Sequence, residues 1–245
     1  MSVRLIPLLL LGVATLGLRF SPVDMAIARR VFDPTLPQPW IWALQLPWGL
    51  LYEYGVWPAW IMAVGGVILA AIAGQKRFGR MRRAGLFLAL VTILGPGLIV
   101  NLALKPWYGR PRPRDLGEFG GQHQFVPVLT LRPVERGTSF PSGHAAMAFC
   151  LFTPAFLFAN RSRSATLAFA AVGVLLGTAV GIARILQGAH FLSDIVWSAG
   201  VVYVTALVLC RVLRLDHVPE PAPEIDISEA VPGSRRQVAL PAGID

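Results

Sequence analysis

Short polar stretches interrupt the apolar runs of this sequence, and their residue types suit the binding of a phosphate group. The residues concerned are Lys105, Arg112, Ser142, Gly143, His144, Arg184, His190 and Asp194. Lysine and arginine supply fixed positive charge, and the planar guanidinium of arginine matches the oxygens of a tetrahedral dianion. The Pro-Ser-Gly sequence at 141–143 would place free backbone N–H groups at the start of a helix, where anions bind. These residues predict a phosphate-binding site if the fold brings them together.

The histidines add groups that can transfer a phosphoryl group once it is bound. His190 and Asp194 are four residues apart, so on a helix the carboxylate can accept a hydrogen bond from one imidazole nitrogen. That bond would fix the tautomer and leave the other nitrogen as a nucleophile. His144 could then protonate the leaving oxygen as a general acid. We expect no metal and no other cofactor, because side chains provide the positive charge.

The elements that must position these residues are membrane helices. The chain has 245 residues, of which 55% are hydrophobic and 14% charged, and its mean hydropathy is +0.60. This composition excludes an ordinary soluble domain. A span needs about 20 apolar residues, and the sequence offers six such segments: 3–20, 53–74, 84–104, 143–159, 165–183 and 191–213. We predict an all-α fold, a polytopic bundle of six transmembrane helices with the active site at one membrane face.

The chain is expected to form one membrane domain followed by a tail. Residues 1–215 hold all six segments. Residues 216–245 are rich in proline and mildly acidic, so we predict a disordered cytoplasmic tail. Residues 21–49 hold too many charges and prolines to span, which favours an interfacial amphipathic helix and a proline-broken turn. The charged residues expected to face solvent or headgroups there are Asp24, Arg29 and Arg30.

Basic residues in the short loops predict the orientation in the membrane. The net charge is +9, and the basic residues that favour one side are Lys76, Arg77, Arg80, Arg82, Arg83, Arg161, Arg163, Arg211 and Arg214. The positive-inside rule makes that side the cytoplasm. Both termini then lie in the cytoplasm, and the polar stretches meet on the extracytoplasmic face of a bacterial-type inner (plasma) membrane. Because topology explains the positive charge, we expect no nucleic-acid binding.

The polar stretches also match a family pattern in order and spacing. The chain has KPWYGRPRP (105–113), PSGH (141–144) and ARILQGAHFLSD (183–194). It resembles the type 2 phosphatidic acid phosphatase superfamily, whose motifs are Lys-x6-Arg-Pro, Pro-Ser-Gly-His and Ser-Arg-x5-His-x3-Asp. Within that superfamily it resembles the integral membrane lipid phosphatases, and more loosely the bacterial lipid A phosphatases. The one departure is Ala183, where serine is common in the family.

The resemblance implies a role for each matched residue. Those that would hold the phosphate are Lys105, Arg112, Ser142, Gly143 and Arg184. His190 would form a phosphohistidine, Asp194 would orient it, and His144 would protonate the leaving group. These roles agree with the arguments from charge and helical spacing.

Residues beside the motifs are further candidates for substrate contact. They are Arg110, Arg114, Trp107 and Tyr108. The two arginines suit lipid headgroups equally well, and the two aromatic residues suit the interfacial belt of a membrane protein better than a substrate platform. Gln187 and Gly188 are expected to form a helix-terminating turn that aims His190.

The sequence therefore predicts an integral membrane phosphatase that hydrolyses a lipid phosphomonoester or pyrophosphate. Lipid A, undecaprenyl pyrophosphate and phosphatidylglycerol phosphate are all compatible substrates. The expected partners are that lipid and the bilayer, with no obligatory protein partner. Two alternatives stay open, a vanadate-dependent haloperoxidase-like enzyme and a non-enzymatic transporter or scaffold. A transporter would line a path through the bundle with its charges, whereas here they gather at one face.

Overall fold

The regular elements in the described part of the chain are helices, as the all-α prediction requires. The computed structural model describes residues 5–40, 42, 45–73, 79–131 and 137–215. The predicted tail at 216–245 lies outside the described residues, as do Lys76 and Arg77 of the basic loop.

The helices differ widely in length, from 4 residues in α6 and α8 to 24 residues in α9. In chain order they are α1 (Ile6–Phe20), α2 (Val23–Val31), α3 (Trp48–Tyr54), α4 (Trp57–Ile72), α5 (Gly79–Thr92), the π-helix η2 (Ile93–Leu104), α6 (Lys105–Tyr108), α7 (Gly143–Phe149), α8 (Ala155–Phe158), α9 (Arg163–Leu186) and α10 (Leu192–Val212). Turns of 3-10 helix occur at Pro113–Asp115, Gly117–Phe119 and Cys150–Phe152.

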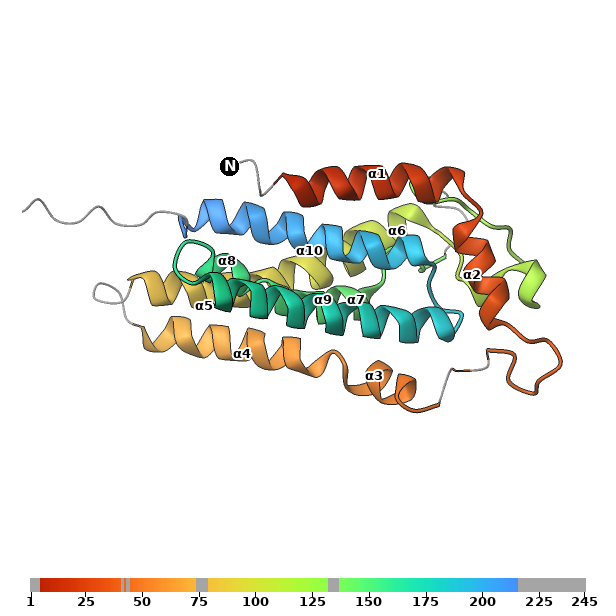
Figure 1. The fold of residues 1–245 in the computed structure, drawn as a ribbon, viewed down its shortest axis with the longest axis horizontal. Helices are drawn as coiled ribbons and strands as arrows, with labels where there is room; N and C mark the ends of the chain where they lie inside the picture. Colours follow the sequence, from red (N-terminus) through yellow and green to blue (C-terminus); the bar gives the residue numbers. More distant parts are fainter. Residues whose placement is uncertain (1–4, 41, 43–44, 74–78, 132–136, 216–245) are drawn as a thin grey trace, which may run out of the picture.

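The long helices lie side by side along the longest dimension of the molecule (Figure 1). α4 packs against α5, α10 contacts α1, α5, α7 and η2, and α9 packs against α7 and α8. The short helices α2, α3 and α6 lie towards one end of the bundle, and α5 begins at the other end (Figure 1). The residues of the predicted site belong to the end where the short helices gather.

Glycines let α9 approach the α7 region closely. A Cβ atom added at Gly177 would lie 2.1 Å from the ring of Phe149, and one added at Gly173 would lie 1.9 Å from the backbone nitrogen of Phe152. Any side chain at either position would therefore push the two segments apart. The close contact fixes α7, which begins with the PSGH motif, against α9, which carries Arg184 near its end.

The structure confirms a polytopic helical membrane protein, and the count of six spans stays a prediction. Four helical segments are long and apolar enough to cross a membrane: Trp48–Ile72, Gly79–Asp115, Arg163–Leu186 and Leu192–Val212. The helix α1 has 15 residues and meets α2 at an angle of 71°, which together make a fifth candidate. The remaining predicted segment is a shorter apolar helix, Gly143–Phe158.

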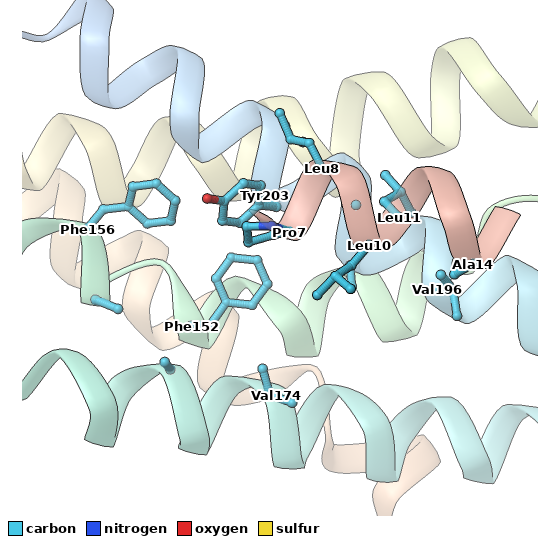
Figure 2. A pocket seen from close by; sticks show the side chains of 14 residues that line it. Pro7, Leu8, Leu10, Leu11, Ala14, Phe152, Phe156, Val174, Val196 and Tyr203 are labelled. Carbon is cyan, nitrogen blue, oxygen red and sulfur yellow. The ribbon is translucent and has the colours of Figure 1, made fainter. Parts of the chain in front are cut away.

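Not all of the space between the helices is filled. A pocket of about 490 Å³ separates part of α1 from α8, α9 and α10. Figure 2 shows Leu8 and Leu11 of α1 on one side of it, with Phe152 and Val174 on the other. The side chains that line it are almost entirely apolar, so it suits hydrocarbon rather than a phosphate group.

Candidate active site

The fold gathers the predicted residues from four separate segments. Lys105 begins α6, Ser142 caps α7, Arg184 is near the end of α9, and Asp194 is in the first turn of α10. The positive charges of Arg184, Lys105 and Arg112 all lie close enough to His144 to act on its imidazole. Residues spread from 105 to 194 therefore form one cluster at the end of the bundle.

The start of α7 lies directly against the lysine of this cluster. A Cβ atom at Gly143 would lie 2.8 Å from the amide oxygen of Asn101 and 3.4 Å from Nζ of Lys105. Lys105 donates a hydrogen bond to that Asn101 oxygen over 2.8 Å, which holds its ammonium in place. A side chain at 143 would enter the space between the backbone and the cation and displace the Asn101 amide.

The cations of the cluster lack carboxylate partners. In the part of the chain that the structure describes, no ion pair joins Lys105, Arg112 or Arg184 to an acidic side chain. Arg184 is only 7% exposed, and its Nε is buried without a hydrogen-bond partner among those residues, as is Nε of Arg112. Buried cations with unused donors are costly without a counter-charge. The arrangement therefore suits a bound dianion.

His190 is held as a neutral imidazole with a fixed tautomer. Its Nδ1 lies 2.7 Å from the carbonyl oxygen of Ser139, to which it must donate, and 3.6 Å from Oδ2 of Asp194. The carbonyl rather than the predicted carboxylate is thus the hydrogen-bond acceptor. Burial lowers the pKa of His190 to about 4, and the nearby charge of Asp194 opposes this only in part. The tautomer leaves Nε2 unprotonated and able to act as a nucleophile.

The structure corrects the expectation that Arg110 contacts substrate or lipid headgroups. Its side chain is 1% exposed and forms ion pairs with both Asp24 and Asp194. Its Nη1 donates to Oδ1 of Asp194 over 2.5 Å, its Nη2 donates to Asp24 over 2.9 Å, and its Nε donates to the carbonyl of Val126 over 2.8 Å. A guanidinium with every nitrogen engaged inside the protein has nothing left to offer a ligand.

Asp24, in the first turn of the amphipathic helix α2, is likewise buried rather than facing solvent or headgroups. It is 2% exposed, and its carboxylate also accepts hydrogen bonds from the backbone and the hydroxyl of Ser193, at 3.0 and 2.5 Å. Arg29 of the same helix is exposed and pairs with Glu118, so the expectation holds for that residue. The carboxylate of Asp24 turns inward because it supplies a counter-charge for Arg110.

Asp194 connects this buried network to His190. Its Oδ2 accepts from the hydroxyl of Ser139 over 2.5 Å and from the backbone N–H of Phe191 over 2.8 Å, while its Oδ1 accepts from Arg110. The same Ser139 presents its carbonyl to His190. Asp194 thus orients the imidazole mainly through Ser139, a residue that no motif indicates.

Tyr52 is a second component that sequence reasoning missed. Its ring stacks on the imidazole of His144 with a centroid distance of 5.1 Å and an interplanar angle of 28°. The guanidinium carbon of Arg184 lies 4.6 Å from the same ring, within reach of a cation–π contact. Tyr52 comes from α3, which is remote in sequence from all three motifs, so only the tertiary contact of α3 with α9 reveals it.

The residues beside the motifs occupy different places. Trp107 is 70% exposed, as expected of an interfacial aromatic residue. Tyr108 packs against Phe140 with a centroid distance of 4.5 Å. The side chain of Arg114 is half-exposed, and its backbone N–H donates to the carbonyl of Gly188 over 3.0 Å.

Gly188 forms the predicted turn that leads into His190. Its φ is +60°, a left-handed conformation that glycine adopts readily. A Cβ atom there would also lie 2.2 Å from the ring of Trp40. Both the backbone conformation and the aromatic neighbour therefore require glycine where the chain turns from α9 towards α10.

Comparison with known proteins supports the family resemblance that the three motifs indicate. The PAP2 superfamily profile matches residues 84–216, which include all three motifs. The chain is 36% identical over 131 residues to the lipid A 4'-phosphatase of Francisella tularensis subsp. novicida, covering 53% of this chain and 58% of the relative. It is 38% identical over 135 residues to the lipid A 4'-phosphatase of Rhizobium leguminosarum, covering 54% and 57%.

A more distant similarity links the chain to another lipid phosphatase. It is 29% identical over 133 residues to phosphatidylglycerophosphatase B of Bacillus subtilis, covering 52% of this chain and 57% of that protein. The chain thus spans little more than half the length of these relatives. No solved structure matches it significantly. Since the family profile covers more than half of the chain and all of its polar motifs, the protein belongs to the PAP2 superfamily.

Proposed function

We propose that this protein is an integral membrane phosphatase that hydrolyses a lipid phosphomonoester or pyrophosphate through a phosphohistidine. The observation that carries the proposal is the cluster of unpaired cations beside a neutral, oriented His190. The three relatives described above are named as lipid phosphatases, which supports a hydrolase acting on phosphoric esters.

The first half of the reaction transfers the phosphoryl group to the protein. Lys105, Arg112 and Arg184 hold the phosphate oxygens, with the backbone at Ser142 and Gly143 alongside. Nε2 of His190 attacks phosphorus in line with the bond to the lipid oxygen. As the N–P bond forms and the P–O bond breaks, His144 donates a proton to the departing oxygen.

The second half returns the protein to its starting state. His144, now neutral, accepts a proton from a water molecule that attacks the phosphohistidine, and inorganic phosphate leaves as the N–P bond breaks. The phosphorylated imidazole keeps its Nδ1–H on the Ser139 carbonyl, close to the negative charge of Asp194. The ion pair with Arg110 holds that carboxylate in position.

An assay of phosphate release from a panel of lipids tests this proposal. We propose a lipid A 4'-phosphate as the first substrate, because the two lipid A 4'-phosphatases are more similar to the chain than the phosphatidylglycerophosphatase is. The panel should include phosphatidylglycerol phosphate and undecaprenyl pyrophosphate, each in detergent with and without a chelator. We expect release that a chelator leaves intact and that Arg184→Gln abolishes. Absence of release from every phospholipid and lipid A species would contradict the proposal.

We propose that the site opens on the extracytoplasmic side of a bacterial inner membrane. The positive-inside rule supports this, because Arg80, Arg82 and Arg83 lie at the opposite end of the bundle from the site. Single cysteines at Gln122 and Gly79, in a variant with Cys150→Ala and Cys210→Ala, test it. An impermeant thiol reagent should label position 122 in intact spheroplasts and spare position 79. Labelling of position 79 alone would place the site in the cytoplasm.

A further inference from the structure

The bundle carries a second cationic site at the end opposite the candidate active site. A groove of about 620 Å³ lies between α4, α5, α8 and α9, and its lining includes Arg80 and Arg161. We propose that this groove binds an anionic phospholipid, with the phosphodiester on the two arginines and an acyl chain along the apolar floor. The proposal is independent of the catalytic mechanism described above.

The charges at the mouth of the groove are not neutralised within the described residues. No ion pair there involves Arg80 or Arg161, and the positive charges of Arg161 and Arg83 repel that of Arg80. Nη1 of Arg80 is buried and has no hydrogen-bond partner in that part of the chain. The two arginines and this unused donor are therefore available to bind a phosphate group.

The neighbouring Arg83 differs from this pair. Its guanidinium donates to the backbone carbonyls of Gly79 and Leu213, at 3.2 and 3.5 Å, so its donors are used at helix ends. It does not line the groove. The unused donor of Arg80 therefore marks the groove rather than the basic end of the bundle in general.

The body of the groove is suited to a hydrocarbon chain. Its floor includes Leu69 of α4, Met81 of α5, Leu157 of α8 and Phe169 of α9. A volume of about 620 Å³ lies in the range of pockets that bind small ligands. The pocket in Figure 2 has a comparable size, but no charged residue is among those that line it. Of these two pockets, the Arg80 groove is therefore the one expected to select a headgroup.

The membrane leaflet at this end favours the same ligand. In the proposed orientation the start of α5 faces the cytoplasm, whose leaflet carries anionic lipids that attract basic residues. Arginine binds phosphate oxygens through charge-assisted hydrogen bonds. A phospholipid combines both requirements in one molecule, since its phosphate reaches the arginines while its acyl chain lies on the apolar floor.

Lipid titrations of the purified full chain in detergent test this site. Phosphatidylglycerol and phosphatidylcholine with identical acyl chains are compared by thermal unfolding and by native mass spectrometry, with glycerophosphoglycerol as the soluble phosphodiester headgroup. We expect phosphatidylglycerol to bind about tenfold more tightly than phosphatidylcholine, and glycerophosphoglycerol to have little effect. Equal responses to the two lipids, or a full response to glycerophosphoglycerol, would overturn the proposal.

Matched double variants distinguish binding in this groove from a general attraction of anionic lipid to the basic end of the bundle. Arg80→Gln with Arg161→Gln should remove the preference for phosphatidylglycerol. Arg82→Gln with Arg163→Gln changes the net charge equally at exposed positions outside the groove and should keep that preference. Loss in both double variants, or in neither, would contradict the proposal.

Two further variants cover misfolding of the double variant and lipid binding at the candidate active site. If the double variant at Arg80 and Arg161 fails to fold, Ala84→Phe should fill the groove and weaken binding while the arginines remain. Arg184→Gln should leave the preference for phosphatidylglycerol unchanged, because Arg184 belongs to the candidate active site. A preference that disappears in Arg184→Gln would assign the bound lipid to that site instead and refute the second one.

Discussion

Two arginine-centred regions meet at the same end of the bundle and differ in their counter-charges. Arg110 is 1% exposed and lies between Asp24 and Asp194, with every guanidinium nitrogen engaged. Arg184 is 7% exposed, has no carboxylate partner among the described residues, and keeps a buried Nε without an acceptor there. Both arginines are buried, but among the described residues only Arg110 has carboxylate partners.

The difference shows how a buried charge can be assigned to structure or to ligand binding. The network around Arg110 is complete, so it acts as a support that positions Ser139 and thereby His190. In the function proposed above, a bound dianion completes the cluster of Lys105, Arg112 and Arg184. Arg110 and Arg112 are two residues apart in the sequence, yet they fall into different classes because of what each side chain contacts.

The largest expected effect is the loss of activity on substitution of Arg184, in the cluster without carboxylate partners among the described residues. Arg184→Gln removes a charge that no carboxylate of the described residues pairs with, so we expect a fall in kcat/KM of about 10²-fold or more with little loss of thermal stability. Phosphate release and thermal unfolding of the same preparation measure both. Arg163→Gln, at an exposed position on the same helix, is the matched control. Destabilisation comparable with the loss of activity would indicate that Arg184 is a structural residue.

Arg110→Gln should mainly lower the stability of the protein, in contrast to Arg184→Gln. Removal of one partner from a buried ion-pair network costs about 3–5 kcal/mol of stability, because it leaves Asp24 and Asp194 buried without their cation. Thermal unfolding should reveal this loss. Asp24→Asn combined with Arg110→Gln should be less destabilising than the sum of the two single changes. Additive effects in that double-mutant cycle would show that the two side chains are not coupled.

The pH dependence of stability should depend on His190. Burial lowers its pKa to about 4 from an ordinary value of 6.5, so the unfolded chain binds the proton more readily than the folded one. Stability is therefore retained above pH 6.5 and falls as the pH drops towards 4, by at most about 1.4 kcal/mol per pH unit for one group. His190→Gln should lose this part of the acid sensitivity in chemical unfolding. An identical pH profile in the variant would mean that His190 is not buried as a neutral imidazole.

Sequence reasoning could predict part of the candidate site because some of its features are local. The spacing of His190 and Asp194 and the left-handed turn at Gly188 are displayed by a single segment, whereas the acceptor for Nδ1 of His190 is the carbonyl of Ser139, which no spacing indicates. The helical nature of each apolar segment was equally accessible from composition. The number of spans was less so, since α1 and Gly143–Phe158 are shorter than the others.

The supporting region could not be predicted for a physical reason. Whether a charge beside a membrane span faces the headgroups or the interior depends on a partner that the segment itself does not contain. Asp24 is 86 residues from Arg110 in the sequence, and Tyr52 reaches His144 from a helix outside the motifs. The amphipathic pattern of α2 indicated a surface helix but could not show that its first carboxylate turns inward.

The central claim is that the unpaired cations bring a phosphoryl group to His190, and trapping of the phosphorylated protein tests it most directly. The purified protein would be mixed with the lipid that the panel assay identifies, radiolabelled in its phosphate, and denatured in alkali within the first turnover. A histidine N–P bond is stable in alkali and breaks in acid. We predict an acid-labile label on the unmodified chain, retained in Arg163→Gln and absent in His190→Ala. A label that persists in His190→Ala, or that survives acid, would contradict the account.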